Sequence, residues 1–508
     1  MLAKVFSVTH LALETISVEV EVNAGRGKPG LSIVGLPSKA VQESQQRVRT
    51  CLQNCGLKFP AKKVTINLAP ADIIKEGPSF DLPIAMGILN AFGHITLSDS
   101  APLFLGELSL DGRIRPVKAV LPAVLHARTH GFQAVIIPSE NQKEVQIISG
   151  ITIHPVSHIT QLIEHFQQKH PLPTISAQPF QSSLSCEIGT DFVNIIGQSI
   201  AKRALEIAAA GSHNVLLNGS PGTGKSMLAK ALTSILPPLT EQEAIEVTTI
   251  YSVAGMSMNG LITDRPFRAP HHTISQVGLI GGSSKLKPGE ISLAHRGILF
   301  MDEFPEFANN CIESLRQPLE DHTVSIVRAS GSTSYPAHFT LIAAANPCPC
   351  GYLLSKKHDC QCNEFAISRY SKKLSGPILD RIDMHIAVQE VDSTKLLQSN
   401  TSMSESSATI LKRVKAARAI QQQRLKNTAY LTNGELDSTA VKQFCTLSSE
   451  AKQILETATN RLHITARSFF KLIKVAQTIA DLEASTQIRD THITEAISYR
   501  QQSRMPVE

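Results

Sequence analysis

A short glycine-rich segment carries the clearest chemical signature of the chain. Residues 219–226 read Gly-Ser-Pro-Gly-Thr-Gly-Lys-Ser, between an apolar run at 215–217 and a stretch with helical spacing. Glycines let the backbone turn tightly enough for several amide N–H groups to face one phosphate chain, and the following helix adds the positive end of its dipole. Lys225 would then reach the β- and γ-phosphates, and the Ser226 hydroxyl would bind Mg²⁺. The residues predicted to contact the nucleotide are Gly219, Ser220, Pro221, Gly222, Thr223, Gly224, Lys225, Ser226 and Met227.

Two acidic residues follow a second apolar run, at residues 297–303, Gly-Ile-Leu-Phe-Met-Asp-Glu. Four consecutive apolar residues suit a strand buried on both faces of a parallel sheet, and acids at its carboxyl end lie beside the phosphate loop. Asp302 would hold Mg²⁺, directly or through water, while Glu303 would polarise the water that attacks the γ-phosphate. These two half-sites predict an enzyme that hydrolyses ATP with Mg²⁺.

A third apolar run, residues 339–345, ends in Asn346. An amide at the carboxyl end of a neighbouring strand could orient the same attacking water and act as a sensor of the γ-phosphate. An ordinary strand-ending turn residue would give the same pattern. The pattern alone leaves both interpretations of Asn346 open.

Composition limits the class of protein around this site. The chain has 508 residues, of which 42% are hydrophobic and 18% charged, and this favours a globular protein of about two to four domains. The first twenty residues contain Glu14 and Glu19 and predict neither a signal peptide nor a spanning helix, and no later stretch is apolar enough to cross a bilayer. Nine cysteines favour a reducing compartment, so we expect a cytoplasmic location. The formal net charge of +6 permits nucleic-acid binding without requiring it.

Changes in periodicity divide the chain into four parts. The first part alternates polar and apolar residues around one stretch of helical spacing, which predicts an α+β domain. A polar segment interrupted by proline follows and is typical of a linker. The α/β core that carries the motifs comes next, and a Ser/Thr/Asn-rich segment separates it from a helical C-terminal region. The predicted bounds are 1–172, 173–190, 191–395 and 396–508.

The motif-bearing core resembles the AAA+ ATPases, specifically their magnesium-chelatase and minichromosome-maintenance branch. The resemblance rests on the spacing of the motifs and on residues 375–383, Ser-Gly-Pro-Ile-Leu-Asp-Arg-Ile-Asp. It implies that Arg381 is an arginine finger that enters the neighbouring subunit's site, and therefore that the chain forms a ring. Arg467, within residues 464–468, is similar to the family's second sensor. Both guanidinium groups would neutralise charge on the γ-phosphoryl group, whereas outside this context each would be interpreted as a surface salt bridge.

The first part resembles the Lon-type serine–lysine peptidase domain, an α+β fold of the ribosomal-S5 type. Ser79 falls at that family's nucleophile, but a serine needs a base to take its proton, and the family uses a lysine of the following helix. Leu121 or Pro122 stands there in this chain, and Lys118 lies about one turn too early. We therefore expect a peptidase-like fold without peptidase activity, serving as a platform for assembly or DNA, with Lys118 as a displaced base the alternative. The matching segments are 75–80 and 106–116.

Four cysteines lie close together directly after the third apolar run. Cys348, Cys350, Cys360 and Cys362 could surround a tetrahedral Zn²⁺, although pairs of zinc ligands are usually separated by two residues rather than one. His358 is a possible substitute ligand. The alternative is a set of small buried or incidental cysteines, and a catalytic thiol is disfavoured because the sequence assigns no histidine partner. A zinc ion here would hold a loop together near the ring pore or subunit interface.

Two inserts are candidates for contacting DNA. Residues 265–273 and 281–290 are rich in glycine, serine, lysine and histidine, which suits an exposed loop, and Lys285 and Lys287 could meet phosphates. Residues 323–328 and 332–337 flank Gly331 and predict a β-hairpin. In the resembling branch this hairpin points into the central pore, which implies a DNA contact for Arg328. The alternative for Arg328 is an ordinary solvated strand residue.

The order of motifs is similar nearly end to end to the bacterial ComM/YifB family of chelatase-like proteins. The segments that carry this resemblance are 201–211, 266–272, 346–351 and 476–482. The resemblance implies a hexameric ATP-driven motor on single-stranded and branched DNA, with branch-migration or helicase activity during recombination of incoming DNA in natural transformation.

Three other functions compete with this interpretation. A chelatase motor subunit would help insert Mg²⁺ into a porphyrin, but such subunits usually lack a peptidase-like N-terminal domain. A Lon-like protease is disfavoured by the missing lysine. An ATP-dependent scaffold would hydrolyse ATP only to change its assembly state, and DNA-stimulated hydrolysis with strand movement would exclude it.

Overall fold

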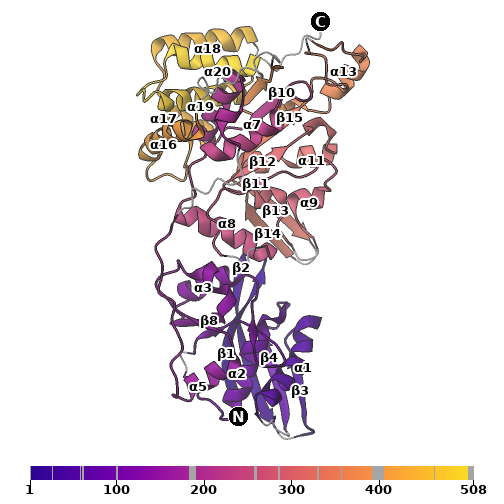
Figure 1. Cartoon of the computed structure of the whole chain (residues 1–508), viewed down its shortest axis with the longest axis vertical. Helices are drawn as coiled ribbons and strands as arrows, with labels where there is room; N and C mark the ends of the chain where they lie inside the picture. Colours follow the sequence, from indigo (N-terminus) through magenta and orange to yellow (C-terminus); the bar gives the residue numbers. More distant parts are fainter. Residues whose placement is uncertain are drawn as a thin grey trace.

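The chain is elongated, with an N-terminal domain at one end and a bundle of C-terminal helices at the other (Figure 1). Between them lies a central core built on a parallel sheet. None of the helices within the described residues combines the length and apolar character needed to span a bilayer. The computed structural model describes residues 2–25, 27–57, 59, 62–98, 101–181, 190–256, 260–283, 286–328, 331–355, 357–391, 405–462 and 464–501.

The N-terminal domain is built on a seven-stranded sheet of order β3-β4-β2-β1-β5-β8-β9. Alternation along β2 buries Val18, Val20 and Val22 against the helices and so explains the period-two pattern of the sequence. Its strands are β1 (Leu2–Leu11), β2 (Glu14–Gly25), β3 (Gly30–Val34), β4 (Lys63–Ala69), β5 (Leu103–Phe104), β8 (Ala134–Pro138) and β9 (Thr152–Val156), with a separate pair, β6 (Glu107–Leu108) and β7 (Ile114–Arg115). Its helices are α1 (Lys39–Asn54), α2 (Asp81–Ala91), α3 (Val120–Thr129), α4 (Gln142–Val145) and α5 (Ile159–Phe166).

The central core contains a five-stranded parallel sheet of order β11-β12-β15-β10-β16. Strands β12 and β15 are buried along their whole length, as expected for apolar runs covered by helices on both faces. The strands are β10 (Val215–Asn218), β11 (Phe267–Arg268), β12 (Ile298–Met301), β15 (Thr340–Ala345) and β16 (Met384–Ala387). The helices are α6 (Ser199–Gly211), α7 (Lys225–Ala231), α8 (Glu241–Ala254), α9 (Gln276–Ile280), α10 (Glu290–Leu293), α11 (Asn309–Ser314), α12 (Pro318–Asp321), α13 (Glu364–Ser371) and α14 (Gly376–Leu379).

The predicted hairpin of the second insert is confirmed. Strands β13 (Thr323–Arg328) and β14 (Gly331–Pro336) pair antiparallel, with Arg328 opposite Gly331 at the end of the ladder. Buried Val324 and Ile326 alternate with exposed Ser325 and Val327, so one face packs on the core and the other is exposed.

The C-terminal helices share one hydrophobic core with the sheet. Leu472 and Ala476 of α19 belong to the same buried cluster as Ala204 of α6 and Val215 of β10. The helices of this region are α16 (Ser407–Arg424), α17 (Ser438–Phe444), α18 (Ser449–Leu462), α19 (Ala466–Leu482) and α20 (Asp490–Gln501).

Helix α8 joins the core to the N-terminal domain. Near its C-terminal end, the Ser252 hydroxyl donates to the buried Glu144 carboxylate of α4. Helix α8 ends at Gly255, in the left-handed region, and a Cβ there would lie 2.6 Å from the Lys118 Nζ. Lys118 therefore lies at the negative end of the α8 dipole.

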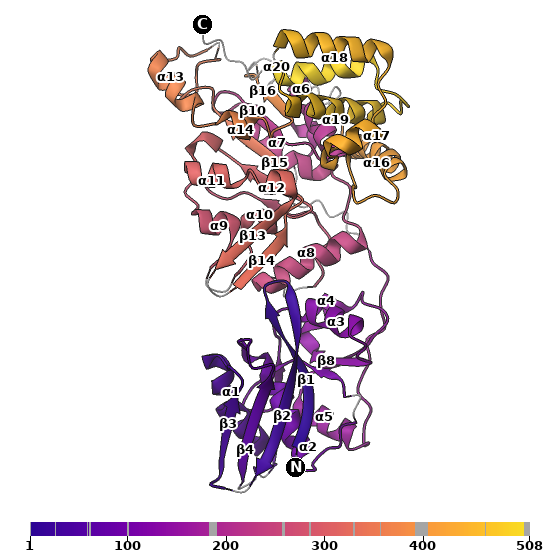
Figure 2. The ribbon, with the colours of Figure 1, turned by 180° about the vertical axis from the view of Figure 1, so that it is seen from behind.

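The tip of the β1–β2 hairpin makes the second junction between the domains (Figure 2). Ala12, in the left-handed region with a φ of 56°, is buried in the same cluster as Val324 and Ile326 of the β13 strand. The N-terminal domain therefore packs directly against the hairpin that the sequence marks as a candidate DNA contact.

The predicted linker, 173–190, is partly docked. The backbone N–H of Ile175 donates to Ile153 at 3.0 Å and that of Gln178 donates to Gln146 at 2.8 Å. Its first residues are therefore attached to the N-terminal domain, while 182–189 lie outside the described residues. Its proline and polar content indicated a lack of regular structure, and it gave no sign of these two backbone contacts.

Candidate nucleotide site and its surroundings

The glycine-rich loop joins β10 to α7 at the carboxyl end of the sheet. Gly222 and Gly224 have φ angles of 77° and 88°, in the region that favours glycine. Gly219 donates its N–H to Ala345 at 3.2 Å, and a Cβ at Gly219 would lie 2.4 Å from the Val388 carbonyl oxygen. The loop can therefore pass between β15 and β16 only with glycine at this position.

The Lys225 ammonium group lies inside this loop and is 9% exposed. Its Nζ donates to the Gly219 carbonyl at 2.6 Å, to the Ser220 carbonyl at 2.9 Å and to the Asn346 Oδ1 at 3.1 Å. Burial lowers the pKa of Lys225, and the nearby Asp302 carboxylate opposes that shift. All these acceptors are neutral oxygens, so a phosphate could replace them without leaving a carboxylate unpaired.

The hydroxyl of Ser226 and the carboxylate of Asp302 meet beside the loop. Ser226 Oγ donates to Asp302 Oδ2 at 2.7 Å, and the Glu303 N–H donates to the other Asp302 oxygen at 3.0 Å. Hard oxygen donors of this kind are the ligands that Mg²⁺ prefers, so the pair fits that ion. The structure thus brings together the two residues proposed to hold it.

Glu303 has a partner that sequence reasoning missed. Its Oε2 lies 3.2 Å from the Nδ1 of His272, and its φ of 51° is unusual for a glutamate. The composition of residues 265–273 predicts an exposed loop in a candidate DNA-contacting insert and no part in the nucleotide site. The consecutive histidines 271 and 272 were the available signal, because histidine readily pairs with a carboxylate.

A cavity of about 370 Å³ lies beside the phosphate loop. Its walls include residues 194–196 and Gln198, ahead of α6, for which the sequence predicts no part in the site. Gln198 fixes this wall, because its amide donates to the Thr223 carbonyl at 3.3 Å and to the Gln389 carbonyl at 2.7 Å. In the sequence, a Gly-Gln pair before a stretch of helical spacing was the available sign of this wall. Tyr352, Lys357 and His358 line the other side.

The predicted arginine finger, Arg381, and the predicted second sensor, Arg467, lie at the opposite, amino end of the sheet. Arg381 precedes β16, and its NH2 pairs with Glu320 Oε2 at 2.6 Å, while the Arg467 NH2 contacts Glu320 Oε1. The four residues of β10 separate this end from the phosphate loop by about 13 Å. Neither arginine therefore lies beside the phosphate loop of its own chain.

The arginines line a second cavity, of about 540 Å³, between the core and the C-terminal helices. On the wall of this cavity, Lys471 of α19 pairs with the buried Asp383 at 2.5 Å. Burial by itself would raise the pKa of Asp383, but the charge of Lys471 and the neighbouring His213 lower it to about 2. This pair fixes α19 to the start of β16.

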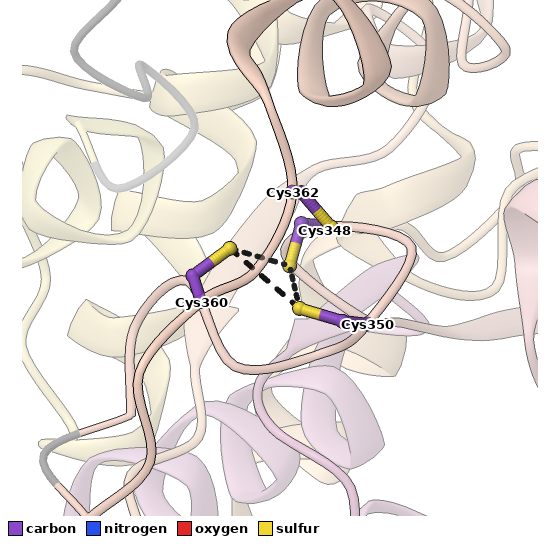
Figure 3. A group of neighbouring side chains, drawn as sticks. All are labelled: Cys348, Cys350, Cys360 and Cys362. Carbon is purple, nitrogen blue, oxygen red and sulfur yellow. Dashed lines mark hydrogen bonds between the residues drawn. The ribbon is translucent and has the colours of Figure 1, made fainter.

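The four clustered cysteines converge (Figure 3). The Cys348 sulfur lies 3.3 Å from Cys350 and 3.7 Å from Cys360, and all four Sγ atoms lie within 4.8 Å of one another. These separations are too long for disulfide bonds and suit four thiolates around one ion, so the cluster could hold a metal such as Zn²⁺. Backbone hydrogen bonding, chiefly from Tyr352, lowers the pKa of Cys350 to about 6. His358, the possible substitute ligand, is not part of this group; its ring lies 5.0 Å from that of Tyr352.

The structure brings the two candidate DNA-contacting inserts together. Arg328 Nε donates to the Gly282 carbonyl at 2.9 Å, and the Tyr335 hydroxyl donates to the Leu286 carbonyl at 2.7 Å. Lys287 is exposed on the same insert, whereas Lys285 lies outside the described residues. Arg328 and Lys287 therefore belong to one continuous surface.

Where the peptidase family has its lysine base, this chain has Leu121 or Pro122. Ser79 lies in a single helical turn, Pro78–Phe80, and is half-buried. Leu121 and Pro122 are buried within α3. Lys118 extends toward Gly255 of the core, a contact that gives this residue a structural role at the domain junction.

Comparison with known proteins covers all parts of the chain. Models of the magnesium chelatase subunit ChlI match residues 20–141 and 191–396, and a model of its C-terminal region matches 404–500. The competence protein ComM of Haemophilus influenzae is 41% identical over 508 residues, covering 99% of this chain and 98% of the relative. The protein YifB of Salmonella typhimurium is 40% identical over 506 residues, covering 99% and 98%. The Lon protease of Brevibacillus choshinensis is 28% identical over 186 residues, 33% of this chain and 24% of the protease.

Proposed function

The chain belongs to the ComM/YifB family of magnesium-chelatase-like AAA+ proteins, and we propose that it is an ATP-driven ring motor acting on branched DNA. In this proposal a homohexamer in the cytoplasm drives branch migration while incoming DNA recombines during natural transformation. The name of one relative, the competence protein ComM, supports that process. The observation that carries the ring is the position of Arg381 and Arg467, at the sheet edge away from their own phosphate loop.

ATP would bind at the carboxyl edge of the sheet. Lys225 would exchange its backbone acceptors for the β- and γ-phosphates, and Ser226 and Asp302 would hold Mg²⁺, which neutralises charge between those phosphates. Glu303 would accept a proton from the attacking water, oriented by Asn346. The hydroxide oxygen would bond to the γ-phosphorus while the bond from that phosphorus to the β–γ bridging oxygen breaks. ADP and inorganic phosphate would then leave, and Glu303 would return its proton to phosphate or solvent.

The neighbouring subunit would complete this site. Its Arg381 and Arg467 would approach the γ-phosphate together, because both already converge on Glu320. A positive group supplied from another subunit stabilises the charge that develops in phosphoryl transfer. Hydrolysis would then depend on contact between subunits, and the C-terminal helices that carry Arg467 would act as a chelatase-type lid domain.

DNA would be gripped through the hairpin β13–β14. Arg328 and the neighbouring Lys287 would pair with backbone phosphates, which gives binding without sequence preference. The N-terminal domain, packed on this hairpin through Ala12, would serve as a platform without peptidase activity.

A chelatase-type motor subunit or an ATP-dependent scaffold is the second candidate, favoured by the three chelatase models that match the chain. Two measurements separate this candidate from the DNA motor. The first is ATP hydrolysis with and without single-stranded or branched DNA, and the second is release of a labelled strand from a three-stranded junction. Stimulation and release that both disappear in Lys225→Ala would support the motor. If DNA does not change the rate of ATP hydrolysis and no strand is released, the second candidate would be favoured.

A further inference from the structure

We propose that the cysteine loop, residues 348–355 and 357–362, is a wall of the nucleotide cavity, and that a metal held by its four thiols sets the affinity for ATP. Tyr352 and His358 would contact the adenine base. This inference rests on the proposed ATPase site, and it adds a role for the metal and two residues for nucleotide binding. The sequence suggested a loop near the pore or subunit interface, whereas in the structure the loop packs on the phosphate loop.

The first observation is the close contact between the two loops. Gly351 has a φ of +86°, and a Cβ there would lie 2.5 Å from the Cδ of Pro221. Pro221 belongs to the phosphate loop itself. A displacement of the cysteine loop therefore removes direct support from the loop that cradles phosphate, and glycine at 351 is required for the two to touch.

The second observation is the lining of the cavity of about 370 Å³. Residues 221–224 of the phosphate loop form one side, and Tyr352, Lys357 and His358 form another. A cavity of this size suits a small-molecule ligand. The rings of Tyr352 and His358 lie 5.0 Å apart and present aromatic faces and edges, to which a purine base can stack. The exposed Lys357 ammonium adds positive charge for the triphosphate.

The third observation is that the thiols bracket the aromatic residues. Cys350 lies two residues before Tyr352, and Cys360 lies two residues after His358, with their sulfurs 3.6 Å apart (Figure 3). Within this segment, turns supply the local order: the Ser355 N–H donates to the Tyr352 carbonyl at 3.0 Å. Closing a loop without regular structure costs conformational entropy, and bonds from both thiol pairs to one metal would offset that cost.

The same loop is connected to the phosphate side of the site. Cys348 follows two residues after Asn346, whose Oδ1 accepts from Lys225 at 3.1 Å. Cys348 is buried and its neighbour Gly351 donates to its carbonyl at 3.0 Å. One metal centre would therefore fix both the sensor end of β15 and the base-contacting residues.

The test measures metal content and nucleotide binding on the full-length chain, purified with zinc. Metal is determined by mass spectrometry, and binding by the fluorescence of a methylanthraniloyl-ATP analogue. We expect one zinc per chain. The double variant Cys360→Ser/Cys362→Ser should lose zinc and bind the analogue about tenfold more weakly, and Tyr352→Ala should keep zinc yet also lose about tenfold, as expected for one lost stacking contact.

Control variants separate this inference from the proposed function. Cys55→Ser removes a thiol from the N-terminal domain, and Tyr352→Phe keeps the ring, so both should retain zinc and affinity. A chain that holds no zinc, or a zinc-free double variant that binds the analogue as tightly as the wild type, would overturn the role of the metal. Unchanged affinity in Tyr352→Ala would overturn the base-contacting wall. If Lys225→Ala binds the analogue as tightly as the wild type does, the proposed ATPase site itself would be overturned.

Discussion

The two edges of the central sheet use positive charge in different ways. At the carboxyl edge, Lys225 is buried and its hydrogen-bond acceptors are carbonyl and amide oxygens. At the amino edge, Arg381 and the half-exposed Arg467 share a carboxylate, Glu320. A phosphate can replace the neutral acceptors of Lys225 without leaving a carboxylate unpaired. Glu320, in contrast, neutralises the two arginines until a stronger anion displaces it. One edge is a cradle formed within a single chain, whereas the other would supply half of a neighbour's site in the proposed ring.

Removing the cation of the carboxyl edge should give the largest effect. Lys225→Ala takes away the group proposed to contact the β- and γ-phosphates, so ATP hydrolysis should fall by on the order of a thousandfold or more and analogue binding should weaken strongly. A phosphate-release assay and fluorescence binding measure the two. Lys230→Ala, on the exposed part of the same helix, is the matched control, and near-normal hydrolysis by Lys225→Ala would contradict the site.

Removing the cation of the amino edge should separate binding from hydrolysis. Arg381→Ala should lower hydrolysis by about a thousandfold while leaving analogue binding nearly unchanged, because the proposed finger would act on a neighbour's γ-phosphate. Mixing this variant with Lys225→Ala should restore part of the activity, since some neighbouring pairs then combine an intact phosphate loop with an intact finger. A mixture as inactive as its components would place Arg381 in a structural role.

Glu320 allows a finer test of the amino edge. Glu320→Gln removes the carboxylate that holds both arginines, so their guanidinium groups should lose their common orientation, and we expect hydrolysis to fall by about tenfold with little change in analogue binding. The adjacent exposed carboxylate provides the control Asp321→Asn. Unchanged hydrolysis in Glu320→Gln would show that the two arginines need no shared partner.

The smallest expected effect concerns acid stability at the same edge. The pKa of Asp383 in the folded chain, about 2, lies below its ordinary value of 3.8. Its contribution is therefore fully present above about pH 4 and is lost as the pH falls toward 2, with a size on the order of 2 kcal/mol. Urea unfolding at pH values across this range should show less acid sensitivity in Asp383→Asn than in the wild type. The exposed Asp72→Asn should behave as the wild type; equal behaviour of both variants would contradict the assignment.

Local patterns predicted the carboxyl edge well, because the geometry there is encoded in contiguous residues. The strand, the glycine turn and Lys225 are neighbours in sequence, and the hairpin around Gly331 is equally local. The proximity of Ser226 to Asp302 followed from the rule that parallel strands end at one edge.

The amino edge and the cysteine loop could not be predicted to the same degree. Arg381 and Arg467 meet at Glu320 of α12, a contact between three separate segments. The four thiols were evident from the sequence. The contact of their loop with Pro221, however, depends on the backbone conformation of Gly351. His272 was missed because pairing with Glu303 requires β11 to lie beside β12.

Helix α8 is placed to transmit motion between the larger cavity and the N-terminal domain. Its 14 residues make a rod of roughly 21 Å. Near the start of the rod, Glu243 holds Arg265 at 3.1 Å on the wall of the larger cavity, and at its far end Ser252 is bonded to Glu144 of the N-terminal domain. Since a stiff rod fixed at both ends transmits tilt, a rotation of about 10° at the cavity would carry the far end by about 4 Å. In the proposed ring, a rotation that a neighbouring subunit imposes at the cavity would therefore displace the N-terminal domain.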